Sequence, residues 1–253
     1  MPAVDHTNRE LLFKIVYYGP GLGGKTTNLE YIYGHSQKQR RGKLLSLCSE
    51  SERTLFFDLL PIGLGRYKGY SIRLHLCTVP GQVFQDRIRK LVLTNVDGVV
   101  FVADSQEPML DSNALSFENL CDNLQLHGLD PKATPLVVQY NKRDLDTALE
   151  LPELRRELGV PRGTVEIEAS ARYGIGVFET LKAIVTECLS KVGEPRALAS
   201  RRASSILPGR RASGYPGATA ARGRQRVELP PPPPAPSFGA KGSKSSRSKA
   251  VGA

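Results

Sequence analysis

The chain contains no tryptophan and only four cysteines among its 253 residues. Cys48, Cys77, Cys121 and Cys188 are far apart and form no C-x-x-C pair, which argues against a zinc site and against a disulfide framework. The four histidines form no cluster typical of a metal centre. These absences favour a protein of a reducing compartment, whose cysteines fill apolar space.

Long apolar runs and a secretion signal are also missing. Asp, Gln or Arg interrupts each apolar segment well before the ~20 residues that a membrane-spanning helix needs. The first residues, MPAVDHTNRELLFK, have no basic start followed by an apolar stretch, and the last, KAVGA, have no cysteine for prenylation. We therefore expect a cytoplasmic protein without a transmembrane segment or prenyl anchor.

The net charge of +10 is unevenly distributed along the chain. Residues 195–253 hold twelve of the 35 basic residues and one acid, Glu228, so residues 1–194 are close to neutral. The basic stretch is rich in Arg, Ser, Gly, Ala and Pro and has little to bury, which predicts disorder. We expect one folded domain over 1–194 and a disordered tail over 195–253. The tail would bind an anionic membrane, nucleic acid or an acidic protein, or only keep the chain soluble.

Short apolar runs alternate with amphipathic segments in the first part of the chain. This alternation is typical of an α/β fold with a mostly parallel sheet and crossover helices. The pattern predicts strands over 11–18, 70–77, 97–105, 135–142 and 164–170. It predicts helices over 24–34, 116–128, 151–159 and 176–192.

The segment GPGLGGKT, Gly19 to Thr26, matches the phosphate-loop pattern and lies between a predicted strand and a predicted helix. Backbone N–H groups of such a loop cradle phosphate oxygens, the lysine reaches the β- and γ-phosphates, and the threonine hydroxyl binds magnesium. A glycine-rich turn with an incidental lysine is the competing interpretation. The predicted nucleotide-binding residues here are Gly19, Gly21, Leu22, Gly23, Gly24, Lys25, Thr26 and Thr27.

Two later segments specify the base. NKRD, Asn141 to Asp144, follows a predicted strand and includes Lys142, and EASA contains Ser170 and Ala171. A carboxylate at Asp144 can accept two hydrogen bonds from the N1–H and N2–H₂ groups of guanine, and adenine offers no such pair. NKRD alone is also compatible with a polar turn. Together with the phosphate loop it predicts a site for GTP and GDP.

The segments KIVYYGPGLGGKTTNLEYIY, ERTLFFDLLP, TVPGQVF, DGVVFVADSQ and QYNKRDL resemble the bacterial MglA family of polarity and gliding-motility switches. The resemblance covers roughly residues 10–192 and implies a P-loop NTPase with the Ras-like three-layer sandwich. It also implies an MglB-like activator of the Roadblock type, downstream effectors, and a location in the cytoplasm or at a membrane or cell pole.

The same resemblance assigns the switch residues. In most related switch proteins TVPGQ reads D-x-x-G-Q, and its aspartate helps to hold magnesium; the family has a threonine there, at Thr78 in this chain. Arg53 matches the family's own arginine finger, and Gln82 matches the glutamine that orients the attacking water. Thr54 matches the residue that senses magnesium and the γ-phosphate. Gly81, the fourth residue of TVPGQ, is a further predicted nucleotide-binding residue. Without the family resemblance, Arg53 is better explained as a solvated surface charge.

These features predict a switch that binds GTP or GDP with magnesium and hydrolyses GTP slowly until an activator aligns Arg53 and Gln82. An alternative function is a GTP-binding scaffold or localisation module that barely hydrolyses and is tethered by its basic tail.

Overall fold

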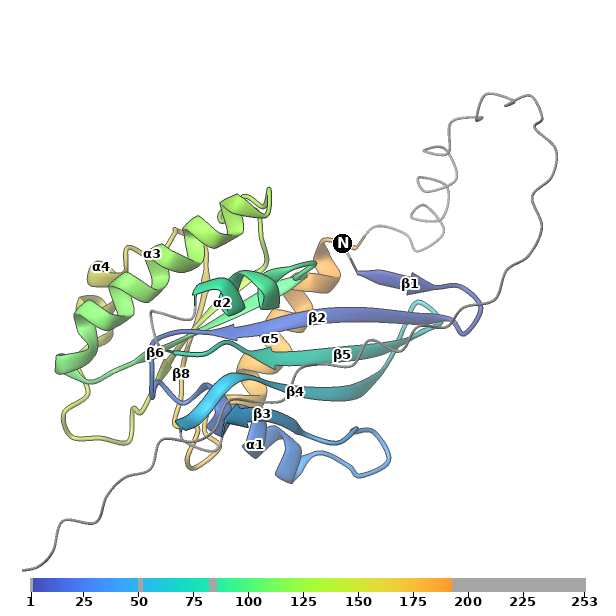
Figure 1. The fold of residues 1–253 in the computed structure, drawn as a ribbon, viewed down its shortest axis with the longest axis horizontal. Coiled ribbons are helices and arrows are strands. Elements are labelled where there is room, and N and C mark those ends of the chain that lie inside the picture. The colour runs from blue at the N-terminus through green and yellow to red at the C-terminus, as the bar shows by residue number, and fades with distance from the viewer. Residues whose placement is uncertain (1, 50–51, 82–85, 193–253) are drawn as a thin grey trace, which may run out of the picture. The chain divides into compact units, whose positions relative to one another are not determined.

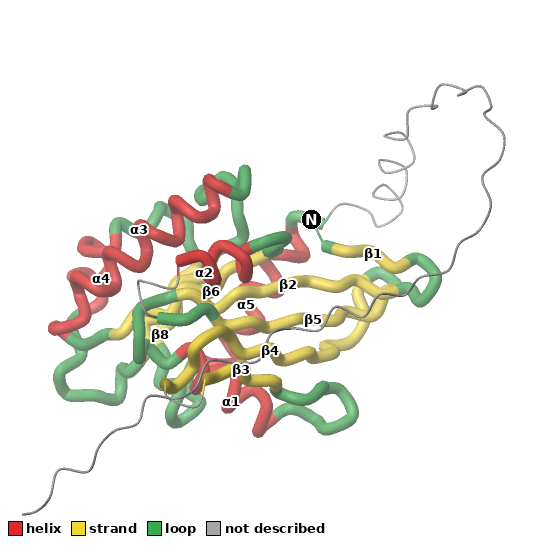
Figure 2. The backbone as a smooth tube through the Cα atoms, viewed as in Figure 1, coloured by secondary structure: helices red, strands yellow, loops and turns green. Residues whose placement is uncertain are grey.

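The computed structural model describes residues 2–49, 52–81 and 86–192 (Figures 1 and 2). For residues 47–49 and 52–57 it describes the backbone and not the side chains. The predicted domain boundary near residue 194 and the predicted disorder of residues 195–253 lie outside the described residues. So does Gln82. No helix in the described part of the chain is long and apolar enough to cross a bilayer.

One sheet runs through the molecule in the order β3-β4-β5-β2-β6-β7-β8. Its strands are β1 (Ala3–Asp5), β2 (Glu10–Tyr18), β3 (Leu45–Ser49), β4 (Glu52–Tyr67), β5 (Tyr70–Thr78), β6 (Gly98–Asp104), β7 (Leu136–Asn141) and β8 (Val165–Glu168). From β5 through β2, β6 and β7 to β8 each pairing is parallel. The pairs β1–β2, β3–β4 and β4–β5 are antiparallel. The sheet is therefore mostly parallel, with an antiparallel edge.

Helices cover both faces of the sheet, as Figures 1 and 2 show. They are α1 (Lys25–His35), α2 (Asp86–Leu93), α3 (Leu110–Leu126), α4 (Leu151–Leu158) and α5 (Val177–Ser190), with a short 3₁₀ helix, η2 (Glu107–Met109). Leu29 and Ile32 of α1 share one core cluster with Ile184 of α5. On the opposite face, α2, α3 and α4 contribute Leu93, Leu120, Leu154 and others to a second cluster. The predicted α/β three-layer sandwich is confirmed.

All five predicted strands and all four predicted helices are present with small shifts at their ends, except that α3 begins at Leu110 rather than at 116. The strands β1, β3 and β4 and the helix α2 were not predicted. In β4, Pro61, Gly63 and Gly65 argue against a strand, and the pairing with β5 does shift its register between Gly63 and Gly65. The antiparallel part of the sheet accommodates these residues through this shift in register.

Candidate nucleotide-binding site

The phosphate loop joins the end of β2 to the start of α1 in a shape that requires glycine at two positions. Gly19 has φ 142°, and a Cβ there would lie 2.3 Å from the carbonyl oxygen of Val102. Gly24 has φ 100°, and a Cβ there would lie 2.1 Å from Asn141 Nδ2. Both positions combine a left-handed backbone with a close neighbour, so they exclude a side chain. The loop therefore presents bare backbone ahead of the N-terminus of α1, as a phosphate cradle requires.

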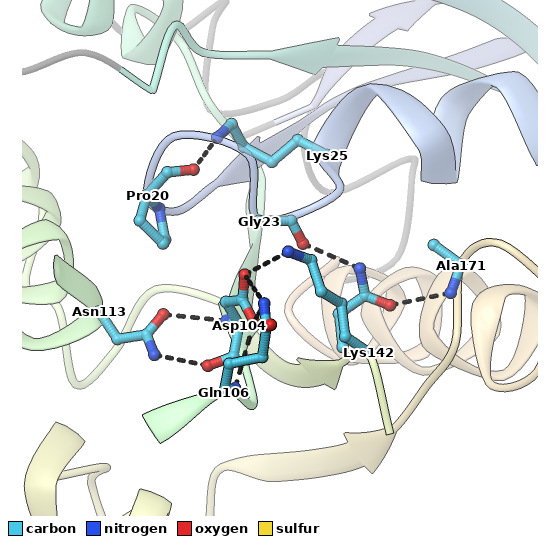
Figure 3. Close-up of polar contacts among 9 residues, drawn as sticks. Pro20, Gly23, Lys25, Asp104, Gln106, Asn113, Lys142 and Ala171 are labelled. Carbon is cyan, nitrogen blue, oxygen red and sulfur yellow. Dashed lines mark hydrogen bonds and ion pairs between the residues drawn. The ribbon is translucent and has the colours of Figure 1, made fainter. Parts of the chain in front are cut away.

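Lys25, the first residue of α1, is buried and folds back over this loop. Its Nζ donates to the carbonyl oxygen of Gly19 at 2.9 Å. It also donates to that of Pro20 at 2.5 Å, the bond drawn in Figure 3. Burial, and next the charge of Arg89, lower the pKa of the Lys25 ammonium to about 7, against the opposing effect of Asp58. An ammonium group held by neutral carbonyls, and destabilised in this way, is well suited to bind an anion.

Asn141 connects the three loops of the site. Its Nδ2 donates to the carbonyl oxygen of Gly23 in the phosphate loop at 2.8 Å. Its Oδ1 accepts from the backbone N–H of Ala171, after β8, also at 2.8 Å; Figure 3 shows both bonds. Because β2, β7 and β8 are parallel, the loops that follow them meet at one edge of the sheet. This one side chain thus connects the phosphate loop to the loops after β7 and β8, which hold the predicted base-binding residues and are called the base side below.

The base-side carboxylate is exposed and held in place from one side. Ser170 Oγ donates to Asp144 Oδ1 at 2.5 Å. Lys142 has φ 67° and forms an ion pair with Asp104 at 2.5 Å, in which the Asp104 carboxylate is buried (Figure 3). The structure therefore brings Asn141, Lys142, Asp144, Ser170 and Ala171 together, at the edge where the sequence predicted a base-binding surface.

A buried carboxylate that the sequence analysis missed lies beside Thr78. Asp58, on β4, is 1% exposed. Its Oδ2 accepts from Thr26 Oγ1 at 2.7 Å and from Thr78 Oγ1 at 3.0 Å, and its own N–H donates to Thr78 Oγ1 at 2.8 Å. The β4–β5 register, which places Leu59 opposite Cys77, sets Asp58 next to Thr78. An acid after the apolar TLFF of ERTLFFDLLP was the available signal.

Gly81 lies against the phosphate loop. A Cβ at Gly81 would lie 2.2 Å from the Cα of Gly21 and 2.6 Å from its nitrogen. Leu22, at the tip of the loop, has φ 61° and is 85% exposed. Thr27 is half-buried in the first turn of α1. The close approach of Gly81 to Gly21 thus sets the end of β5 against the phosphate loop.

The remaining predicted residues are those that the family resemblance assigns to a switch. Arg53 and Thr54 lie in the backbone of β4, but their side chains, like all of Gln82, are outside the described residues. Within the ranges that the structure describes, no group of three or more His, Cys, Asp or Glu side chains is placed to hold a metal ion. Magnesium at phosphates needs few protein ligands, because it keeps several waters and takes phosphate oxygens.

A phosphate loop after the first parallel strand, with N-K-x-D and S-A turns at the same edge of a three-layer sandwich, defines a P-loop protein with the Ras-like fold. No protein-family model matches the chain. The chain is 52% identical over 192 residues to the mutual gliding-motility protein MglA of Myxococcus xanthus (strain DK1622), an alignment that covers 76% of this chain and 98% of that protein. The chain belongs to the MglA family.

Proposed function

We propose that the protein is a small GTPase switch that binds GTP and GDP with magnesium and hydrolyses GTP. The observation that carries the proposal is the pair of hydrogen bonds from the Asn141 side chain to Gly23 and Ala171. They connect the phosphate loop to the loop after β8. Asp144, positioned by Ser170, would accept the two donors of guanine. Lys25 would exchange its carbonyl partners for the β- and γ-phosphates.

Oxygen donors around Thr26 fit a magnesium ion. The Thr26 hydroxyl would bind the ion directly, and the buried Asp58 carboxylate, 2.7 Å from that hydroxyl, would supply the negative charge that Thr78 lacks. Held by Thr26 and by phosphate oxygens, the ion would supply positive charge against the negative charge that develops during phosphoryl transfer. Thr54 is proposed as the second threonine ligand by its match to the family.

Hydrolysis is assigned to Arg53 and Gln82. The Arg53 guanidinium would stabilise charge on the transferred phosphoryl group, and the Gln82 amide would orient the attacking water. Both assignments follow from the family motif. An MglB-like activator of the Roadblock type would press the two side chains onto the γ-phosphate, and effectors would read the resulting change in the loops around Thr54 and Gly81.

The relative's name concerns gliding motility. We propose a related role in motility or polarity for this chain, in the cytoplasm or peripherally at a membrane or pole. The basic tail over 195–253 would contribute sequence-independent attraction to an anionic membrane, nucleic acid or an acidic protein. Deleting the tail should leave nucleotide affinity unchanged and remove salt-sensitive binding to anionic vesicles or DNA. Equal binding by the shortened chain would refute this role.

Single-turnover hydrolysis tests the function. The protein should bind GTP and GDP in preference to ATP, hydrolyse GTP slowly alone, and hydrolyse it much faster with a Roadblock-type activator. A scaffold would bind the same nucleotides but respond to no activator. Equal competition by ATP would contradict both functions.

A further inference from the structure

Arg89 is a buried arginine beside the phosphate loop to which none of the predicted roles applies. It lies in the first half of α2 and is 2% exposed. Its guanidinium donates three hydrogen bonds: from Nε to the carbonyl oxygen of Pro80 at 3.0 Å, from Nη2 to that of Gly81 at 2.7 Å, and from Nη1 to Asn119 Oδ1 at 2.9 Å. One rigid fork thus holds two consecutive carbonyl groups of the segment that follows β5.

The surroundings of Arg89 are polar but carry no direct counter-charge. Among the described side chains, no carboxylate forms an ion pair with Arg89. The nearest acid in its network is Asp86, which accepts from Asn119 Nδ2 at 3.2 Å, and the Tyr18 ring faces the guanidinium at 5.6 Å. Burying a cation that has only neutral acceptors lowers the stability of the fold. This cost points to a role for Arg89 in another interaction.

Peptide geometry shows what this fork fixes. In a trans peptide the C=O and the N–H of the same unit point in opposite directions, and the described chain has no cis peptide. Because the Pro80 carbonyl points to Arg89, the Gly81 N–H points away from it. The Gly81 backbone also lies against Gly21 of the phosphate loop. Arg89 therefore sets the direction of a backbone donor at the edge of the phosphate cradle.

We propose that Arg89 is a positioning residue for the γ-phosphate: it holds the Gly81 peptide so that its N–H is available to GTP, which raises the affinity for GTP relative to that for GDP. This inference rests on the proposed function. Lys25 and Arg89 are both buried beside the phosphate loop, so a further phosphate would stabilise both cations.

The test compares affinities of the full chain for GDP and for a GTP analogue with a non-hydrolysable β–γ bridge. Arg89→Lys keeps a charge and the aliphatic stem but loses the fork, and Arg89→Ala loses both. Each should lower the ratio of analogue affinity to GDP affinity by roughly 10- to 100-fold, the effect of a lost hydrogen bond to a charged group. Arg87→Ala, which removes an exposed arginine from the same helix, should leave the ratio unchanged.

A purely structural role would weaken both nucleotides equally, and a latch that excludes the γ-phosphate would raise the ratio; either result overturns the proposal. If neither Arg89 variant folds with GDP bound, Asn119→Ala removes the acceptor of Nη1 and leaves Arg89 in place. It should lower the same ratio by a smaller factor, and an unchanged ratio would count against the proposal. If the unaltered protein binds neither nucleotide, the proposed function itself is wrong, so the two failures are distinguishable.

Discussion

The base side and the switch side of the site are held together in different ways. On the base side, Asn141 and Ser170 bond to groups in the turns that follow parallel strands of the sheet, β2, β7 and β8. On the switch side, Asp58 from β4 bonds to Thr26 of α1 and Thr78 of β5. A motif on the base side carries its function within a few consecutive residues. On the switch side, the function is shared between residues that only strand pairing brings together.

We propose that this difference lets Thr78 stand where an aspartate is usual. Because β4 and β5 are antiparallel neighbours, a carboxylate on β4 reaches the same hydroxyl of Thr26 as one on β5 would. A charge can therefore move between paired strands without leaving the site. Local motifs tolerate no such move, since their geometry depends on one turn.

The largest effect should come from the switch side. Arg53→Ala and Gln82→Ala should each preserve GTP binding and lose activator-stimulated hydrolysis. For Arg53→Ala the stimulated rate should fall by ~10³ to 10⁵-fold, because the guanidinium stabilises the transition state and not the bound GTP. Single-turnover assays with a Roadblock-type activator measure this. Arg66→Ala, which removes an exposed arginine from the same strand, is the matched control and should hydrolyse normally. If the activator stimulated hydrolysis by Arg53→Ala as strongly as by the unaltered protein, another residue would have to act as the arginine finger.

On the base side, Asp144→Asn should weaken GTP binding by roughly 10² to 10⁴-fold, because two hydrogen bonds to a charged acceptor are lost. Preference should shift toward xanthosine nucleotides, whose O2 accepts from the new amide. Competition assays with GTP, xanthosine triphosphate and ATP measure both changes. Asp146→Asn, an exposed carboxylate two residues on, should behave as the unaltered protein. A normal GTP affinity for Asp144→Asn would show that the base is recognised elsewhere.

The contrast between the two sides also explains which site residues could be predicted from the sequence and which could not. GPGLGGKT and NKRD each lie after a strand whose apolar run is plain, so their positions at one sheet edge follow from a parallel sheet alone. Asp58 and Arg89 were missed because nothing near them in sequence indicates their partners. Asp58 meets Thr78 only through the β4–β5 register, and Arg89 meets Pro80 at a separation of nine residues along the chain.

Asp58, which the β4–β5 register sets beside Thr78, is the carboxylate that we propose for the magnesium site. Asp58→Asn should raise the magnesium concentration needed to retain bound nucleotide by about 10- to 100-fold, as outer partners of metal ligands typically do. Nucleotide release measured against magnesium concentration tests this. Ser46→Ala, which removes the hydroxyl 2.7 Å from the other Asp58 oxygen and leaves the charge, should have a much smaller effect.

The reverse substitution probes the same pair. Thr78→Asp would set two carboxylates within hydrogen-bonding distance, where like charges repel, so it should give no gain in unstimulated hydrolysis. Asp58→Thr combined with Thr78→Asp should recover part of the magnesium dependence that Asp58→Thr loses. A faster unstimulated rate for Thr78→Asp alone would mean that Thr78 marks a decayed site.

The smallest effect concerns Lys25, where both sides of the site meet at the phosphates. Its pKa is lowered to about 7, chiefly by burial, and phosphate oxygens would raise it again. Binding should therefore take up a proton above pH 7, and nucleotide affinity should fall by up to about tenfold per pH unit as pH rises from 7 toward the ordinary lysine value. Calorimetry between pH 7.5 and 8.5, in buffers of different ionisation enthalpy, measures the uptake. Lys25→Arg, whose guanidinium keeps its proton, should abolish the uptake even if it binds more weakly. Binding without proton uptake in the unaltered protein would mean that Lys25 is already charged before the phosphates arrive, and that the carbonyl oxygens of Gly19 and Pro20 are sufficient partners for its ammonium group.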